Sequence, residues 1–155
     1  MNEPPRANGL SILVIDHDSN ELKALVIGLR LEGFKVEGAS SSASALQTLA
    51  AVGFDVALID LMVPETNGLQ LSRMIRAQFP EVTTILMSAY HLSLAQLVRA
   101  NTGAVGFVPK PFRFDDLVQF VRAKAARSSS TPPAPLAATA PDNGLHTPFE
   151  LPRTA

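Results

Sequence analysis

The chain has 155 residues, of which 46% are hydrophobic, so its length and composition suit one domain with a buried core. Its 13 basic and 14 acidic residues leave no basic excess for electrostatic binding of nucleic acid or an anionic membrane. Cysteine is absent, which excludes disulfides, cysteine-ligated zinc and thiol catalysis. The sequence contains no recognisable targeting or membrane segment, so we expect a cytoplasmic protein that does not associate with membranes.

Composition divides the chain into three parts. Residues 1–9 lack an apolar core and are predicted to be a flexible N-terminal segment, whereas residues 10–126 are predicted to fold as one domain. From residue 127 to residue 155 prolines are frequent among serine, threonine and alanine. This tail has too few large apolar side chains to offset the entropy of ordering it, so we predict that it is disordered.

Within residues 10–126, apolar runs alternate with helical patterns five times. Strands are predicted at 12–15, 34–37, 54–59, 83–87 and 104–108. The first helix is predicted to begin at the N-cap Asp18, with Glu21 three residues later, and to stop at Gly33. The other helices are predicted at 42–51, 69–79, 92–100 and 114–126. In the third helix, the spacing predicts that Leu71, Met74 and Ile75 face inward.

This alternation with short connections predicts a doubly wound α/β fold, in which helices cover both faces of a five-stranded parallel sheet. In such sheets the ligand site lies outside the carboxyl ends of the strands. Polar residues follow four of the predicted strands: Asp16-His17-Asp18, Asp60, Ser88 and Lys110-Pro111. Two buried carboxylates at one edge favour a shared cation, and Mg²⁺ is the usual choice where phosphate is also bound.

With these polar residues at the ends of its predicted strands, the sequence resembles the CheY-like receiver domains of bacterial two-component response regulators over roughly residues 10–126. The resemblance implies the flavodoxin-like strand order 2-1-3-4-5. The matching stretches occur in the family's order and spacing, and they are Ile12–Asp16, Asp60–Pro64 with Gly68, Met87–Ala89 and Gly103–Phe112. Gly68 is expected to permit a turn before the third helix. The fifth strand is expected at a sheet edge, where Pro109 and Pro111 are tolerated.

The resemblance implies a phosphorylation switch centred on Asp60, which matches the phosphoacceptor. Asp16 matches an acidic metal-binding position, and the backbone carbonyl of Met62 matches a further metal contact. Ser88 and Lys110 match the hydroxyl and the amine that bind the phosphoryl group.

Three further positions are assigned by the same resemblance. Phe107 matches an aromatic residue that swings inward on activation, although packing in the core explains it equally well. The side chains of Met62 and Tyr90 match positions that border the phosphoryl group and tune its lifetime. They are expected to slow hydrolysis, because methionine orients water poorly and a tyrosine ring crowds its approach.

His17 departs from the family pattern, which usually has a second metal-binding acid at this position. Three outcomes are open. Mg²⁺ can still bind weakly through Asp16, Asp60, waters and Asp18. Neutral His17 can ligate a softer metal such as Mn²⁺ or Zn²⁺. Alternatively, the site is no longer phosphorylated, and the domain is a pseudo-receiver that binds partners constitutively.

The sequence favours a stand-alone receiver that takes its phosphoryl group from a histidine kinase or a phosphotransfer protein. It is not expected to be an enzyme beyond self-phosphorylation and self-dephosphorylation. Output is expected through protein–protein contact on the surface of the fourth helix, fifth strand and fifth helix, without nucleic acid and with a homodimer left open. The alternative is a phosphorylation-independent interaction module. A flavin- or nucleotide-binding protein is disfavoured, because the loop after the first strand lacks a phosphate cradle.

Overall fold

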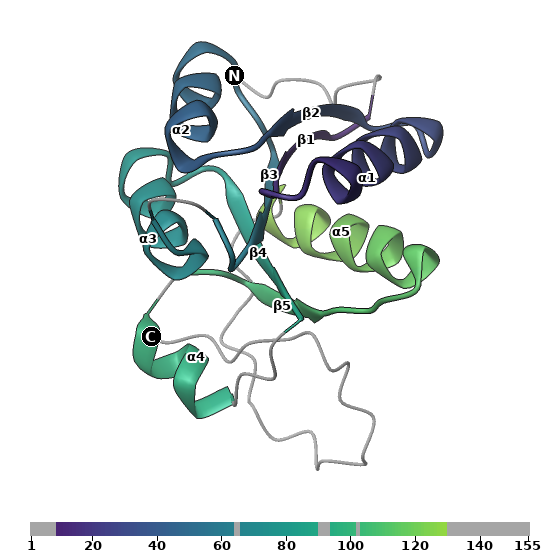
Figure 1. Ribbon diagram of the computed structural model, residues 1–155. Helices are drawn as coiled ribbons and strands as arrows, with labels where there is room; N and C mark the ends of the chain where they lie inside the picture. Colours follow the sequence, from purple (N-terminus) through teal and green to yellow (C-terminus); the bar gives the residue numbers. More distant parts are fainter. Residues whose placement is uncertain (1–8, 64–65, 90–93, 102, 130–155) are drawn as a thin grey trace.

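The computed structural model describes residues 9–63, 66–89, 94–101 and 103–129, and these form a five-stranded sheet with helices on both faces (Figure 1). The strands are β1 (Ser11–Ile15), β2 (Lys35–Ala39), β3 (Val56–Asp60), β4 (Thr83–Ser88) and β5 (Gly106–Pro109). The helices are α1 (Ser19–Leu31), α2 (Ser42–Ala51), α3 (Gly68–Gln78), α4 (Leu94–Ala100) and α5 (Phe114–Ser129). Apart from Gly9 and residues 127–129, the predicted N-terminal segment and tail lie outside the described residues.

The sheet is parallel throughout, with the order β2-β1-β3-β4-β5. The predicted doubly wound fold and strand order are therefore confirmed, and β5 is an edge strand as expected. Helices α1 and α5 cover one face, and α2 and α3 cover the other (Figure 1). The change of direction between β1 and β3 marks the topological switch point, where ligands bind in such folds.

The central strands form because their side chains are apolar on both sides. Successive residues of a strand point to opposite faces, so β1 and β3 each contribute to two separate cores. Val14 and Leu58 pack with the α1 and α5 side chains, whereas Ile15 and Ile59 pack with those of α2 and α3. All four side chains are fully buried, and this anchors the carboxyl ends of both strands.

Strand β2 begins one residue later than predicted, at Lys35, and ends two residues later, at Ala39, because Gly38 pairs with Val14 of β1 and does not end the strand. The glycine also admits α1 at close range. A Cβ atom on Gly38 would lie 3.0 Å from Leu22 Cδ1. The edge strand therefore continues through a residue whose small size allows the helix to pack against it.

The helices agree with prediction apart from two larger differences and a one-residue shift of α3, which spans Gly68–Gln78 where 69–79 was predicted. Helix α5 continues to Ser129, three residues beyond the predicted end at Ala126. Met74 of α3 was predicted to face inward, but the residue is 37% exposed. Leu71 and Ile75 alone supply the buried apolar face at this level of α3. The predicted start of the fourth helix at residue 92 lies outside the described residues. None of the described helices is long and apolar enough to cross a membrane.

Candidate functional site

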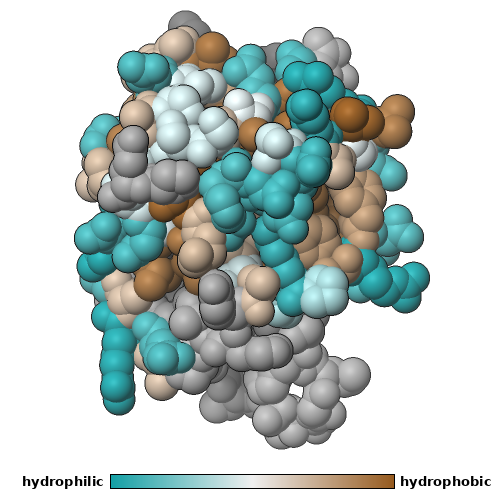
Figure 2. Space-filling view, viewed as in Figure 1, coloured by the Kyte–Doolittle hydropathy of each residue, from teal (hydrophilic) through white to brown (hydrophobic). Residues whose placement is uncertain are grey.

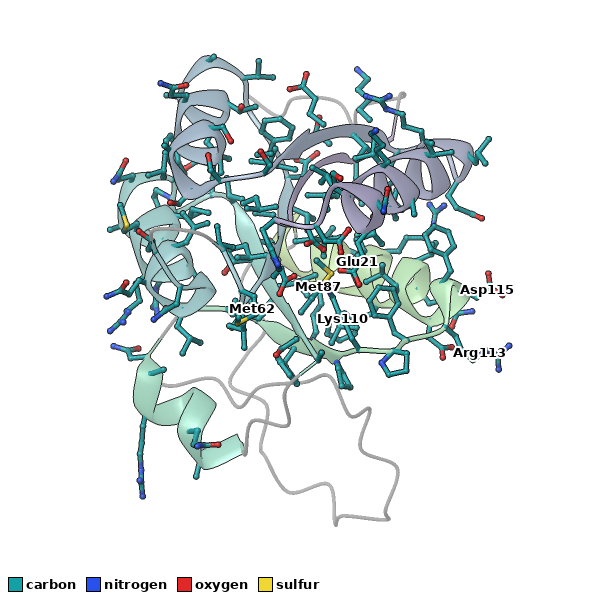
Figure 3. The ribbon with its side chains drawn as sticks, in the orientation of Figure 1. Glu21, Met62, Met87, Lys110, Arg113 and Asp115 are labelled. Carbon is teal, nitrogen blue, oxygen red and sulfur yellow. The ribbon has the colours of Figure 1, made fainter. Side chains whose placement is uncertain are left out.

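Four of the predicted site residues meet at the carboxyl ends of the strands. Asp16 directly follows β1, Asp60 ends β3, Ser88 ends β4, and Lys110 follows β5. The strand register aligns Asp60 with Met87, just before Ser88, and aligns Ser88 with Pro109, just before Lys110. The site residues therefore lie along one edge of the sheet. Chain segments nearly a hundred residues apart thus form one polar cluster, which lies near the centre of the view in Figure 3.

Lys110 joins the two buried carboxylates. Its Nζ lies 3.3 Å from Asp16 Oδ2 and 3.1 Å from Asp60 Oδ2. Asp16 is fully buried and Asp60 is 4% exposed, so neither charge is solvated by bulk water. An unpaired carboxylate in such a place is costly, and the ammonium between the two offsets part of that cost.

Backbone amides fix the other oxygen of each carboxylate. The amide of Asp18 donates to Asp16 Oδ1 at 2.9 Å, and that of Met62 donates to Asp60 Oδ1 at 3.0 Å. Each acidic side chain therefore bonds the amide two residues later, as aspartates do at turns. As a result, Oδ1 faces the loop and Oδ2 faces Lys110 in both residues. Met62 itself is half exposed.

His17 lies beside this pair. Its Nδ1 is 3.8 Å from both Asp16 Oδ1 and Asp60 Oδ2, and 46% of the side chain is exposed. One ligand atom from each of the three residues lies within 4.8 Å of the others. Two carboxylates and an imidazole are donors that divalent cations accept, so the side chains present fit a metal ion. The imidazole makes this donor set softer than a cluster of acids alone.

Asp18 has a different role from Asp16 and His17. Its Oδ1 accepts the amides of Asn20 at 2.9 Å and Glu21 at 3.1 Å, so it is the N-cap of α1, as predicted. These backbone hydrogen bonds, from Glu21 and Asn20, lower the pKa of Asp18. Of the two residues left open as an additional metal ligand, His17 is the one grouped with Asp16 and Asp60 among the described residues.

The electrostatics of Asp16 and Lys110 follow from burial and mutual contact. Burial raises the pKa of Asp16 to about 6, and the amide of Asp18 offsets this rise only in part. Burial by itself would lower the pKa of Lys110. Hydrogen bonds to Glu21 and Asp60, and then the charges of Asp60 and Asp16, reverse this and raise its pKa above the ordinary value. Lys110 therefore stays charged throughout the neutral range.

The remaining predicted residues are placed as follows. Ser88 is buried at the end of β4, and its backbone carbonyl accepts the amide of Lys110 at 2.8 Å. Phe107 is buried in the same core as Ile59 and Leu86. Tyr90 lies outside the described residues. The Lys110–Pro111 peptide bond is cis.

Gly68 serves a purpose other than the predicted turn. Its φ is not in the left-handed region, but a Cβ atom there would lie 2.5 Å from the carbonyl oxygen of Asp60 and 2.7 Å from Leu61 Cα. Its amide donates to the carbonyl of Leu61 at 2.9 Å. Glycine is therefore required so that the start of α3 can pack directly against the backbone of the acceptor strand.

Sequence reasoning missed Glu21 as a member of this cluster. Its Oε2 lies 2.6 Å from Lys110 Nζ, the shortest of the three carboxylate contacts of that lysine. The capping pattern accounted for Glu21 at the sequence level, yet the structure directs its carboxylate across to Lys110. The available signal was its place in the first turn of the helix that directly follows a site strand.

Comparison with known proteins agrees with this geometry. The family model of the response regulator receiver domain matches residues 12–122. The DNA-binding response regulator MtrA of Mycolicibacterium smegmatis is 33% identical over 121 residues, which cover 78% of this chain and 53% of MtrA. The chain thus spans about half the length of the curated relatives it matches, so the stand-alone and no-nucleic-acid expectations stay predictions.

Solved structures are similar over the same region. A CheY-like receiver domain protein from Methanospirillum hungatei aligns with a TM-score of 0.72 at 25% identity, covering 77% of this chain and 96% of that one. The response regulator TrrA of Thermotoga maritima, solved in complex with Mg²⁺–BeF, aligns with a TM-score of 0.66 at 28% identity. That alignment covers 74% of this chain and 97% of TrrA. The sheet order, the cluster at its carboxyl edge and these matches agree, and the chain belongs to the family of response regulator receiver domains, which are signalling domains of two-component systems.

Proposed function

We propose that this receiver accepts a phosphoryl group on Asp60 from the phosphohistidine of a histidine kinase or phosphotransfer protein. The observation that supports this most directly is the 3.1 Å contact between Lys110 Nζ and the buried Asp60 carboxylate. An amine that already touches the acceptor is in reach of the oxygens of an incoming phosphoryl group. Electrostatic positioning of this kind is the main requirement of phosphoryl transfer, because its transition state is loose and highly charged.

In the transfer, an oxygen of the Asp60 carboxylate attacks phosphorus. The phosphorus–nitrogen bond to the donor histidine breaks, and its electron pair returns to the imidazole. Asp60 exchanges its carboxylate charge for an acyl phosphate, so Lys110 loses one ionic partner and gains the phosphoryl oxygens. The hydroxyl of Ser88, at the end of the neighbouring strand, is the second group that we propose binds the phosphoryl group.

A divalent cation is the proposed cofactor, held by Asp16, Asp60, the backbone carbonyl of Met62 and His17. When bound, it would supply charge neutralisation for the phosphoryl oxygens. Mg²⁺ prefers oxygen ligands, whereas Mn²⁺ accepts imidazole more readily. The donor set of Asp16, His17 and Asp60 therefore favours Mn²⁺, or weak binding of Mg²⁺.

The proposed output is contact with another protein through the α4–β5–α5 surface. Strand β5 is one of the two edge strands of the sheet, and Phe107, the proposed switch residue, lies on it. A change at Ser88 has a short route to this surface, because Ser88 pairs with Pro109 of β5. A homodimer formed through the same surface is one form that this contact can take. The domain acts in this scheme as a phosphoacceptor that is switched, and not as a turnover enzyme.

The test is treatment with acetyl phosphate and Mg²⁺ or Mn²⁺, followed by intact-mass measurement. We expect a gain of one phosphoryl group in the wild type and none in Asp60→Asn. Asp55→Asn is the matched control, because Asp55 lies just before β3 at the opposite end of the sheet, where its Oδ2 accepts the Ser11 amide. Labelling that survives in Asp60→Asn would refute the assignment of the acceptor.

The same measurement addresses the second candidate, a pseudo-receiver that binds partners without phosphorylation. The observation that favours it is the half-exposed His17 beside Asp16 and Asp60, because a neutral imidazole attracts a cation less than an acid does. Failure of the wild type to gain a phosphoryl group with either metal would support this candidate.

A further inference from the structure

We propose that Glu21 is a positioning residue that competes with the phosphoryl group for the ammonium of Lys110. The inference rests on the proposed phosphoacceptor function. A lysine ammonium has three N–H donors, and here the Nζ of Lys110 contacts three carboxylates. The contact with Glu21, at 2.6 Å, is shorter than those with Asp60 at 3.1 Å and Asp16 at 3.3 Å.

The start of α1 holds Glu21 in this position. Its backbone amide is bound to the N-cap Asp18, which orients the first helical turn against the site. The side chain then reaches Lys110, which lies 89 residues away in the sequence (Figure 3). Figure 2 shows the molecule from the same side as Figure 3, and the middle of this face is mostly hydrophilic, with apolar side chains to either side.

With all three ammonium donors engaged, a phosphoryl oxygen can bind Lys110 only by displacing a carboxylate. Asp60 gives up its carboxylate charge when it is phosphorylated, whereas Glu21 keeps its own. Glu21 therefore remains as an acceptor for Lys110 and as a negative charge close to the phosphoryl dianion. The negative charge of Glu21 should therefore weaken the binding of an anion beside Lys110 and strengthen the binding of a cation in the same cluster.

The position of His17 makes this charge significant. The cluster has an imidazole where the family resemblance implies a second acid, and Glu21 adds a carboxylate on the α1 side of Lys110. Glu21 thus restores negative charge to the cluster from a different direction. It does so through the lysine that binds the phosphoryl group, and it is not among the residues grouped with the metal donors.

Glu21→Gln tests the proposal, because it keeps the shape of the side chain and removes the charge. Half of the Glu21 side chain is exposed, so we expect the variant to fold normally. Beryllium trifluoride serves as the anion and is titrated by ¹⁹F NMR at saturating Mg²⁺, which is diamagnetic and leaves the fluorine signal sharp. The affinity of the variant for the anion should rise about three- to tenfold, a range that allows for solvent screening of an exposed charge. Its affinity for Mn²⁺ alone, measured by calorimetry, should fall by about the same factor.

The opposite signs are the signature of the proposed role, because general loosening of the site would weaken both ligands. Glu32→Gln is the matched control. It removes a carboxylate at the other end of α1, where the C-cap lies about 16 Å from Glu21 by the helical rise. This control should leave both affinities unchanged.

The failures are distinguishable. If the wild type binds the anion and Glu21→Gln binds it equally or more weakly, Glu21 does not compete for Lys110, and the phosphoacceptor function still stands. If the wild type with metal fails to bind beryllium trifluoride, the proposed function fails together with the inference.

Discussion

Replacing Lys110 with methionine should destabilise the domain strongly at neutral pH. The variant keeps the length of the side chain and removes the ammonium that contacts Asp16, Glu21 and Asp60. Asp16 and Asp60 then remain buried with no cation between them. Only 13% of the Lys110 side chain is exposed, so water cannot readily take its place.

The expected loss is about 3 kcal/mol in the free energy of unfolding. Removing one partner of a buried ion pair costs about 3–5 kcal/mol, and we take the lower end because the half-exposed His17 leaves one side of the site open to water. Acidification should reduce this loss. The folded-state pKa of Asp16 is raised to about 6 from 3.8, so the folded protein favours the protonated carboxyl. The stability that this protonation contributes is full below about pH 4 and is lost as pH rises through about 6. In the wild type the charge of Lys110 lowers the pKa of Asp16. The variant lacks this charge, so the pH range over which protonation of Asp16 stabilises it extends to higher pH.

Urea unfolding at about pH 7.5 and about pH 5, without metal, measures both effects. The deficit of Lys110→Met relative to the wild type should be smaller at the lower pH. Lys35→Met, on the exposed side of the edge strand β2, is the matched control and should be nearly neutral at both pH values. A deficit below about 1 kcal/mol at neutral pH, or one that grows on acidification, would show that Lys110 does not compensate buried charge.

Three further changes probe the site. His17→Asp restores a second acid, so affinity for Mg²⁺ measured by calorimetry should rise about tenfold, or about 1.4 kcal/mol, and unchanged or weaker binding would mean that the imidazole is remote from the metal or binds Mg²⁺ as well as a carboxylate does. Gly68→Ala should lose about 1–3 kcal/mol in urea unfolding, because its Cβ would contact the backbone of Asp60; full stability would mean that α3 shifts freely. Met62→Asn combined with Tyr90→Glu should shorten the half-life of the phosphorylated protein about tenfold, and equal decay in both forms would show that neither side chain controls access of water.

The fold class was predictable because the alternation of strands and helices is written in local patterns, whereas the strand order was implied by the family resemblance. Apolar runs such as 12–15 are buried on both faces, and alternating strands and helices allow few arrangements. What local patterns could not give were features that depend on distant neighbours. Gly38 stays in β2 because β1 pairs with it and α1 packs over it. Met74 lies at the margin of a helical face, and only the position of the sheet decides that it is exposed.

The same division applies to the site. The meeting of Asp16, Asp60 and Lys110 followed from the topology, since the carboxyl ends of parallel strands share an edge. Glu21 could not be recognised in this way, because its role depends on where a helical side chain reaches. At the sequence level, the position of Glu21 three residues after the N-cap Asp18 already explained it as part of a helix-capping pattern. The role of a long side chain in the first helical turn after a site strand can therefore be assigned only from the three-dimensional structure.

The division of the interior by the sheet has a consequence for how mutations combine. Leu58 and Ile59 are bonded neighbours, yet they belong to different cores. Leu58 instead shares its core with Val14, its partner in β1. Free-energy changes combine additively when side chains share no partners, and they couple when side chains pack together. Substitutions at Leu58 and Ile59 should therefore couple less strongly than substitutions at Leu58 and Val14, which lie 44 positions apart but pack together. Shared core membership should therefore predict epistasis in this domain better than distance along the sequence does.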